Sequence, residues 1–410
     1  MKVLFVFGGL PHYYNLVLSR LNEVENLEII VVVPSDKKGQ SLGEGVYQTT
    51  EGINFKRYHL NEYKNWFGKP FFKDFFDVVN KEKPDVIVAG WPYILSFYLN
   101  PFNYLKIKSS GIKIIDKDIP FRVPRYKEAI GFYKSLGDIP QDTNPFTNFI
   151  GFLKYLNIFI LTKIRRFYFN QVDAHVNYVE DAYDILGSYG VPAEKIFISY
   201  NSPDTDMLFK VKDEVIKSEK LLPPNNHRLL HVGRLVEWKR VDLLIKVYAR
   251  LKKLYADAEL LIIGYGPQKE ELEELVRSLG LKDVKFLGGV YDQKMLGQYF
   301  TESSVYVLAG MGGLSINEAM LYEKPVICSV CDGTEKKLVR DEYNGKYFIE
   351  GNEDDLFEKI NYLFSRPELM ETMGKNSGRI IREEININTV INGYLDSFNF
   401  VTKNRFQLKA

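Results

Sequence analysis

The 410-residue chain has few cysteines and no marked excess of either charge. Two cysteines are too few for a disulfide scaffold, and they suit a reducing compartment. Lys and Arg number 54 against 53 Asp and Glu, so the sequence lacks the strong basic excess of a dedicated nucleic-acid binder. We therefore expect no nucleic-acid partner.

A long apolar segment is also lacking. The apolar run 3–7 meets Gly8, Gly9 and Pro11 too soon to form the core of a signal peptide. The most apolar later stretch, 149–161, is shorter than the roughly 20 residues that span a bilayer. We expect a cytoplasmic protein, either soluble or peripheral on the inner face of the membrane.

The composition is otherwise that of a globular protein, with 45% hydrophobic and 26% charged residues. Aromatic residues are frequent at 14%. Residues 101–170 hold twelve Lys or Arg and five Asp or Glu, so the near-neutral total hides a basic region. Charge segregated in this way indicates one basic face.

Strand-like and helix-like patterns alternate in both halves of the chain. Apolar runs at 3–7, 27–33, 85–89, 113–115 and 174–178 predict strands in the first half. The runs 228–232, 259–263, 284–287, 305–308 and 325–328 predict strands in the second half. Alternation of this kind predicts doubly wound α/β domains with parallel sheets.

The predicted domain boundaries follow from this alternation of strands and helices. We expect a Rossmann-like domain at 1–205, a second one at 206–385, and a C-terminal segment at 386–410 that packs back on the first domain. Residues 210–226 are predicted to be a charged connector, and 118–150 a long functional loop. Two such domains facing each other would place their strand ends on one interdomain cleft.

Three glycine-containing turns follow predicted strands of the second half. In the first, 231–239, Gly233 lets the backbone approach a ligand, and the turn leads into a helix. Arg234 can bind phosphate through two hydrogen bonds, and Lys239 adds a nearby charge. A solvated basic turn is the alternative for this motif taken alone.

The second turn, 263–267, contains Gly264 and Gly266. It lacks the third glycine of a dinucleotide fingerprint, and Pro267 follows at once. We interpret it as a tight strand-to-helix turn near a base or ribose.

The third turn, 308–320, has glycines at 310, 312 and 313 just before a predicted helix. Their free backbone N–H groups form a cradle for phosphate. Glu318 lies in the first turns of that helix, where its carboxylate can accept two hydroxyl hydrogen bonds from a ribose. A glutamate that only favours the helix dipole is equally compatible with the spacing.

In their order and spacing these features resemble the GT-B glycosyltransferases of family 4, the glycosyl transferases group 1. The resemblance covers most of residues 191–350, including Ile198 to Asp204 with Phe209, Gly333 to Glu335, and Asn344-Gly345. The first half matches only in layout, through Gly8 and Gly9 at the end of the first strand, and we assign both glycines to the donor site.

The resemblance implies a retaining hexosyltransferase that uses a nucleoside-diphosphate sugar, with UDP or GDP, and no further cofactor. Arg234 and Lys239 would neutralise the diphosphate leaving group without a metal ion, and Glu318 would bind ribose. The backbone of Gly312, Gly313, Leu314 and Ser315 would contact phosphate or sugar. Asp118, with Arg122 after the same strand, is a candidate for the acceptor side.

The sequence departs from the family pattern at one position. The family's usual motif has a glutamate eight residues before Glu318, where it contacts the donor sugar, and Gly310 stands there in this chain. The sequence Gly-Met-Gly-Gly-Leu-Ser resembles a variant branch that lacks the first Glu of this E-x7-E motif. An inactive homologue therefore stays an alternative.

Other reactive residue types have simpler interpretations. Cys328 and Cys331 have redox or half-zinc spacing, but no second pair exists, and we interpret them as inert small residues. His227 and His231 flank a buried strand and are expected to be structural. His12 is a candidate cleft residue.

Residues 149–170 combine aromatic and basic character. They contain no acidic residue and four cations, Lys154, Lys163, Arg165 and Arg166. An apolar aromatic helix with such cations can lie in an anionic membrane interface. A buried helix with a solvated basic end is the alternative.

The leading hypothesis is a glycosyltransferase that acts on a glycan or lipid-linked acceptor in bacterial surface polysaccharide synthesis. The rivals are a nucleotide-sugar epimerase or phosphorylase on the same fold and a catalytically silent nucleotide-binding protein.

Overall fold

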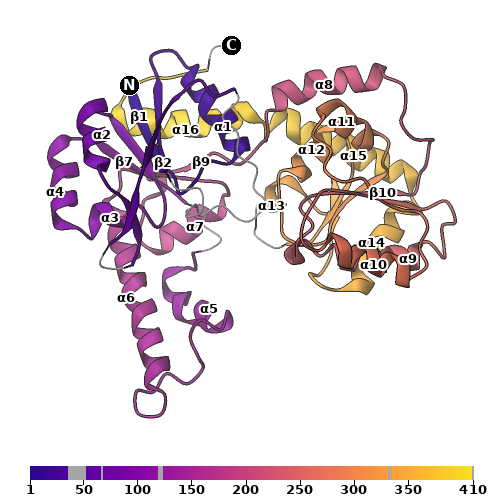
Figure 1. Cartoon of the computed structure of the whole chain (residues 1–410), viewed down its shortest axis with the longest axis horizontal. Helices are drawn as coiled ribbons and strands as arrows, with labels where there is room; N and C mark the ends of the chain where they lie inside the picture. The colour runs from indigo at the N-terminus through magenta and orange to yellow at the C-terminus, as the bar shows by residue number, and fades with distance from the viewer. Residues whose placement is uncertain (36–51, 66–67, 119–122, 331–332, 334, 409–410) are drawn as a thin grey trace. The chain divides into compact units, whose positions relative to one another are not determined.

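The chain folds into two compact units in the computed structural model, which describes all residues except 36–51, 66–67, 119–122, 331–332, 334 and 409–410. One unit comprises Met1–Tyr200 together with Asn388–Ala410, and the other comprises Asn201–Ile387. Each unit contains a parallel sheet with helices around it (Figure 1). The predicted α/β architecture with two Rossmann-like folds is confirmed.

The first unit is built on a seven-stranded sheet in the order β3-β2-β1-β6-β7-β8-β9. After the charged first residues of β1 and β2, the strands β1, β2 and β6 are apolar and buried, as in parallel sheets whose two faces are both covered. Val3 pairs with Ile29 on one side and with Val86 on the other. The strands are β1 (Lys2–Val6), β2 (Glu28–Pro34), β3 (Lys56–Leu60), β6 (Val86–Ala89), β7 (Lys113–Lys117), β8 (Ala174–Asn177) and β9 (Ile196–Ile198).

The helices of the first unit lie on both sides of this sheet, and a small β4–β5 pair (Glu62–Lys64, Pro70–Phe72) accompanies it. The last helix, α16 (Ile387–Thr402), returns to β1, where the ring of Tyr394 lies 5.9 Å from that of Phe5. The other helices are α1 (His12–Asn22), α2 (Phe75–Glu82), α3 (Leu95–Tyr98), α4 (Pro101–Ser110), α5 (Ala129–Ser135), α6 (Phe149–Gln171) and α7 (Asp181–Ser188).

The second unit has a six-stranded parallel sheet in the order β12-β11-β10-β13-β14-β15. Its strands are β10 (Arg228–Val232), β11 (Glu259–Ile263), β12 (Val284–Phe286), β13 (Val305–Leu308), β14 (Val326–Cys328) and β15 (Gly345–Tyr347). Its helices are α8 (Thr205–Lys217), α9 (Val241–Leu251), α10 (Lys269–Ser278), α11 (Gln293–Thr301), α12 (Ser315–Leu321), α13 (Glu335–Leu338), α14 (Glu353–Phe364) and α15 (Pro367–Glu383).

Two segments are more regular than predicted. Residues 210–217 belong to α8, so the connector begins only after Lys217. The predicted loop 118–150 contains a 3-10 turn at Tyr126–Glu128 and the helix α5. The apolar side of α8 packs against the second unit, as the buried Leu208 and Val215 show, and this packing makes a helix of a segment whose charges suggested a linker.

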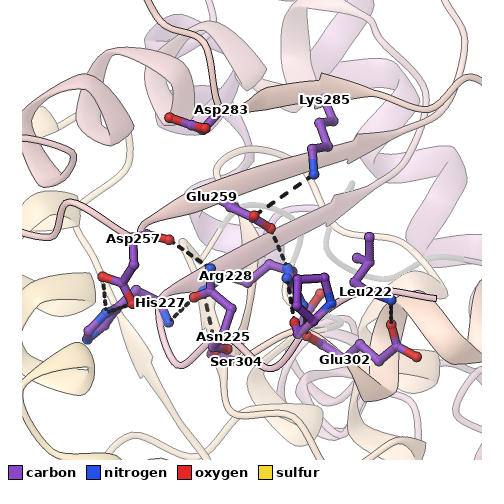
Figure 2. A network of polar contacts seen from close by, with 12 residues as sticks. Leu222, Asn225, His227, Arg228, Asp257, Glu259, Asp283, Lys285, Glu302 and Ser304 are labelled. Carbon is purple, nitrogen blue, oxygen red and sulfur yellow. Dashed lines mark hydrogen bonds and ion pairs between the residues drawn. The ribbon is translucent and has the colours of Figure 1, made fainter. Parts of the chain in front are cut away.

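The connector is anchored at the amino end of the second sheet by a buried arginine (Figure 2). Arg228 is fully buried, and its Nε donates to Glu259 Oε2 at 2.7 Å. Its two other nitrogens donate to the carbonyl oxygens of Glu302 at 2.7 Å and Pro223 at 2.9 Å. The carboxylate of Glu302 in turn accepts from the backbone N–H groups of Leu221 and Leu222. This network fixes where the chain enters β10.

Candidate functional site

The candidate site of the second unit lies at the carboxyl ends of β10 and β13. These two strands are neighbours at the point where the strand order reverses. Crevices at such switch points are the usual ligand sites of open α/β sheets. Gly233 follows β10 directly, and the glycine-rich segment 309–314 follows β13.

The first turn carries Arg234 from the end of β10 toward a 3-10 turn at Glu237–Lys239. Arg234 is half-buried, and its guanidinium carbon lies 5.7 Å from the centroid of the Trp238 ring. Arg240 adopts a left-handed φ of 50°, which ends this turn and starts α9. The sequence therefore places Arg234 on a constrained turn at the edge of the sheet.

The second turn packs against the first through its glycines. Gly264 has φ 147°, and a Cβ there would lie 1.8 Å from the carbonyl oxygen of Gly233. A Cβ on Gly266 would lie 2.1 Å from the carbonyl oxygen of Leu235. In addition, Gly233 donates its backbone N–H to Ile263. Gly264 and Gly266 thus hold the two turns in contact, a packing role that the sequence alone does not reveal.

The third turn is bonded to the first as well. The N–H of Met311 donates to the carbonyl oxygen of Trp238 at 2.9 Å. A Cβ on Gly310 would lie 2.2 Å from that same oxygen and 2.7 Å from the carbonyl carbon of Lys239. A side chain at position 310 is therefore excluded unless the backbone moves.

Lys239 joins the two turns through its side chain. It is 7% exposed, and its Nζ donates to the carbonyl oxygens of Met311 and Gly312, each at 2.6 Å. Nζ also lies 3.2 Å from the position that a Cβ on Gly313 would occupy. The predicted cation is thus close to the predicted glycine cradle, and it fixes the backbone of that cradle.

The cradle itself presents backbone donors. In the part of the chain that the structure describes, the N–H groups of Gly312, Gly313 and Leu314 have no acceptor. Ser315 follows, and its Oγ accepts a hydrogen bond of 2.7 Å from the hydroxyl of Tyr306 on β13. Unpaired amides near a cation are suited to an anion such as phosphate.

Tyr306 was not singled out from the sequence, although a signal for it exists. Its hydroxyl contacts both Ser315 and the carbonyl oxygen of Val232, so it links the ends of β10 and β13. A tyrosine within an otherwise apolar, buried strand needs a hydrogen-bond partner for its hydroxyl. That requirement could have indicated a polar contact at this edge of the sheet.

Glu318 lies in the first turn of α12, as predicted. Burial raises the pKa of its carboxyl group to about 7. Among the described residues, none donates a hydrogen bond to this carboxylate. Burial raises the pKa values of Tyr306 and Tyr322, and the charge of the nearby Glu318 carboxylate adds to this effect. A carboxylate without a donor can accept hydroxyl groups of a ligand.

His231 is a buried neutral imidazole beneath the first turn. Burial, and secondly the charge of Lys239, lower its pKa to about 4. Its Nδ1 lies 3.2 Å from the carbonyl oxygen of Val307, which assigns the proton to Nδ1. Its Nε2 is buried, has no hydrogen-bond partner among the described residues, and lies 3.3 Å from the position of a Cβ on Gly233.

The remaining predicted site residues belong to the first unit. Gly8 and Gly9 follow β1, and Gly9 has φ 151°. Asp118 follows β7 and is half-buried. Burial raises the pKa values of Tyr168 and Tyr178, and the charge of Asp118 adds to this effect. The adjacent Lys117 donates to the hydroxyl of Tyr178 at 2.6 Å. These residues share the carboxyl edge of their sheet, whereas Arg122 lies outside the described residues.

The other reactive residues have structural surroundings. Cys328 is buried at the end of β14, and Cys331 lies outside the described residues. His227 contacts Asp257 at 2.8 Å, and this hydrogen bond lowers the pKa of the Asp257 carboxyl. The side chain of His12 lies outside the described part. No cluster of three metal-binding side chains occurs among the described residues.

The four cations predicted to form one basic surface do not all lie on it. Arg165 is 8% exposed, donates to the hydroxyl of Tyr133, and lies 5.3 Å from the centroid of the Trp91 ring. Its expected place at a membrane interface is therefore wrong. On α6 it lies on the side that faces the sheet, whereas Lys154, Lys163 and Arg166 are exposed.

Residues 212–379 match the family glycosyl transferases group 1. An uncharacterized glycosyltransferase of Haemophilus influenzae is 30% identical over 43% of this chain and 50% of its own length. The uncharacterized glycosyltransferase MJ1069 of Methanocaldococcus jannaschii is 25% identical over 95% of this chain and 94% of its own length. The group 1 match includes all of the second-unit site residues described above.

A further relative is the Campylobacter jejuni N-acetylgalactosamine-N,N'-diacetylbacillosaminyl-diphospho-undecaprenol 4-alpha-N-acetylgalactosaminyltransferase. It is 27% identical over 45% of this chain and 49% of its own length. The chain thus spans about half of two of these three relatives and nearly all of the third.

Solved structures extend the likeness to the whole chain. Anabaena HepE in complex with UDP has a TM-score of 0.64 at 18% identity and covers 97% of this chain and 100% of its own. A glycosyltransferase from Rickettsia africae has a TM-score of 0.65 at 16% identity and covers 98% and 99%. At these identities the likeness establishes the fold, which is that of the GT-B glycosyltransferases.

Proposed function

We propose that the chain is a retaining glycosyltransferase that moves a sugar from a nucleoside-diphosphate sugar to a glycan or lipid-linked acceptor. The observation that carries the proposal is that Arg234, Lys239 and the amides of 312–314, which have no acceptor among the described residues, all lie in the turns that follow β10 and β13. Positive charge and oriented N–H groups at one switch point are what a diphosphate requires.

Each part of the donor then has a proposed partner. Arg234 binds the diphosphate, and the amides of Gly312 and Gly313 contact its oxygens. Lys239 holds the cradle in shape and adds its charge, because two of its protons already bind the carbonyl oxygens of Met311 and Gly312. Glu318 accepts the ribose hydroxyls, in agreement with its lack of a donor among the described residues.

The proposed chemistry is the departure of the nucleoside diphosphate with stabilisation of its charge. Arg234 and Lys239 stabilise the leaving group in the role that a metal ion has in other transferases. Preorganised charges of this kind are often the largest contribution to catalysis, and the loss of one donor typically costs 100- to 1,000-fold in rate. Asp118 is proposed to act on the acceptor side from the first unit.

The comparisons support a choice of substrate class. Anabaena HepE is described in complex with UDP, and the Campylobacter relative is named for a diphospho-undecaprenol acceptor. We propose a UDP-sugar, with GDP-sugars as the second choice, and an acceptor of bacterial surface polysaccharide synthesis. A cytoplasmic place, peripheral on the inner face of the membrane, suits such an acceptor.

The direct test is nucleoside diphosphate release from a panel of UDP- and GDP-sugars, with and without lipid-linked or oligosaccharide acceptors. We expect acceptor-dependent release, and product NMR should show the donor's anomeric configuration. Arg234→Ala should lower the rate at least 100-fold. Its control is Arg277→Ala, an exposed arginine on α10 that should leave the rate unchanged. Full activity in Arg234→Ala would remove the proposed diphosphate site.

A catalytically silent nucleotide-binding protein is the second candidate, and one observation favours it. The contact of Gly310 with Trp238 and Lys239 leaves no room for a side chain at the position of the family's donor-sugar glutamate. A nucleotide that raises the melting temperature without any release from the donor panel would select this candidate. Conversion of a donor sugar without an acceptor would instead select an epimerase.

A further inference from the structure

Helix α6 carries an exposed apolar face on the first unit. Figure 1 shows α6 extending beyond the strands of its own sheet. Phe149 is 62% exposed, Ile150 is 70% exposed, and Phe146, in the preceding loop, is 96% exposed. Contiguous exposed apolar side chains on one element mark an interaction site more often than a free surface.

The exposed apolar residues form one line along the helix. Phe149, Leu153, Leu156, Ile160 and Phe167 follow one another at intervals of three, four and seven residues, and all are exposed. We call these five residues the α6 stripe. Such intervals keep side chains on one face of a helix. The buried residues of α6, among them Thr162, Arg165 and Phe169, lie on the other side, so the stripe faces away from the core of the unit.

Cations accompany the stripe, and acids do not. The sequence contains no Asp or Glu from 143 to 172, whereas Lys154, Lys163 and Arg166 are exposed on α6. Lys163 donates to the hydroxyl of Tyr126 at 2.7 Å, and the Arg166 guanidinium lies 4.8 Å from the Tyr126 ring. Hydrogen bonds from both cations lower the pKa of Tyr126. Two of the three charges are thus held beside the stripe.

The charge pattern decides between two occupants of this surface. A second copy of the chain, pairing stripe to stripe, would bring Lys163 and Arg166 of both copies into one interface without an acidic residue on either helix. Like charges in an interface oppose association. An anionic bilayer offers both an apolar boundary and negative headgroups, which is the combination that apolar and cationic side chains on one helix require.

We propose that the α6 stripe, with Lys154, Lys163 and Arg166, binds the surface of an anionic phospholipid bilayer. The helix lies along the interface, since none of the described helices is long and apolar enough to cross a membrane. The stripe enters the boundary between headgroups and acyl chains, and the three cations bind lipid phosphates. This membrane site belongs to the first unit and is independent of the donor chemistry, so either proposal can fail while the other stands.

The test is co-sedimentation of the full chain with vesicles. We expect binding to vesicles of phosphatidylglycerol and phosphatidylcholine, weak binding to phosphatidylcholine alone, and a loss of binding at high salt. Combined Lys154→Gln, Lys163→Gln and Arg166→Gln should lower the partition coefficient roughly tenfold or more. The matched control is Lys253→Gln with Lys282→Gln and Lys294→Gln, three exposed lysines of the second unit, which should bind as the native chain does.

The contribution of the apolar stripe residues to vesicle binding is tested with a separate pair of double variants. Phe149→Ser with Leu153→Ser should weaken vesicle binding, whereas Leu254→Ser with Ile349→Ser, which are 60% and 66% exposed on the second unit, should not. Thermal melting of each variant establishes that it is folded. Equal pelleting of native and stripe variants would overturn the proposal. So would a dimer in light scattering that the stripe variant converts to a monomer, because that result assigns the stripe to a second copy.

Measuring vesicle binding and nucleoside diphosphate release on the same variants distinguishes the membrane site from the proposed transfer reaction. A stripe variant that loses vesicle binding but retains nucleoside diphosphate release with a soluble acceptor supports the membrane site as a distinct function. Vesicle binding without any transfer activity would retain this inference and refute only the proposed function.

Discussion

Lys239 donates a hydrogen bond of 2.6 Å to the carbonyl oxygen of Met311, so that a cation in one turn fixes the backbone of another. The two residues are 72 positions apart, and they follow two neighbouring strands of one sheet. The carbonyl groups that bind Lys239 belong to the segment whose amides are proposed to bind diphosphate. The site is therefore a single unit in which loop shape and positive charge depend on each other.

Lys239→Met should damage both stability and donor binding. The substitution leaves the carbonyl oxygens of Met311 and Gly312 without their buried donor, at a cost of about 1–3 kcal/mol in the free energy of unfolding. We expect weaker binding of UDP by calorimetry and loss of transfer activity. Lys253→Met, at an exposed lysine of the same unit, serves as the control. Native affinity for UDP in Lys239→Met would show that the loop does not depend on this contact.

Gly310→Ala should destabilise the protein, because its Cβ would lie 2.2 Å from the carbonyl oxygen of Trp238. We expect a loss of about 1–3 kcal/mol in the free energy of unfolding, measured by denaturant titration. Gly187→Ala is the control, since a Cβ there meets nothing within 4 Å and alanine favours a helix. If Gly310→Ala unfolds at the same denaturant concentration as the native protein, the close contact of the two turns is not maintained in solution.

Glu318 should make the stability of the folded protein depend on pH. Burial raises its pKa to about 7, so the folded state holds a proton that the unfolded state loses near pH 4.5. This group therefore favours the folded state at low pH, and its contribution falls as the pH rises from about 4.5 to 7. Glu318→Gln should remove that part of the pH dependence in melting experiments.

Protonation of the Glu318 carboxyl should also weaken the binding of the nucleotide through its ribose. If the ionised carboxylate accepts two ribose hydroxyls, UDP should bind roughly tenfold more tightly at pH 8 than at pH 6. Calorimetry at both pH values measures the ratio. A ratio near one in the native protein, or the same ratio in Glu318→Gln, would remove Glu318 from the nucleotide site.

Arg228→Met should test the network that anchors the connector (Figure 2). The guanidinium is fully buried, and its loss leaves Glu259 and two carbonyl oxygens without their donor. Breaking a buried ion pair by removing one partner costs about 3–5 kcal/mol. Arg277→Met, which removes an exposed ion pair with Glu274, should leave the melting temperature nearly unchanged. Equal melting of the two variants would show that the network contributes little.

The order of the strands and of the three glycine turns could be predicted from local pattern. Buried parallel strands are continuous apolar runs, so β1, β2 and β10 were evident in the sequence. The edge strand β3, Lys56–Leu60, was missed because it is polar and partly exposed, whereas the edge strand β12, Val284–Phe286, was predicted. Helix α4, Pro101–Ser110, buries only Ile107 and gives little periodic signal.

The sequence by itself determined the residue types of the site and their order along the chain, because glycines, cations and one carboxylate follow strands at fixed intervals. Only the tertiary structure decided what they contact. It placed Gly264 and Gly266 against the first turn, directed Lys239 to the carbonyl groups of Met311 and Gly312, and buried Arg165 while leaving Lys163 exposed. Sequence pattern reports how one element is buried, whereas these contacts join elements many residues apart, and their geometry arises when the sheet and its helices pack.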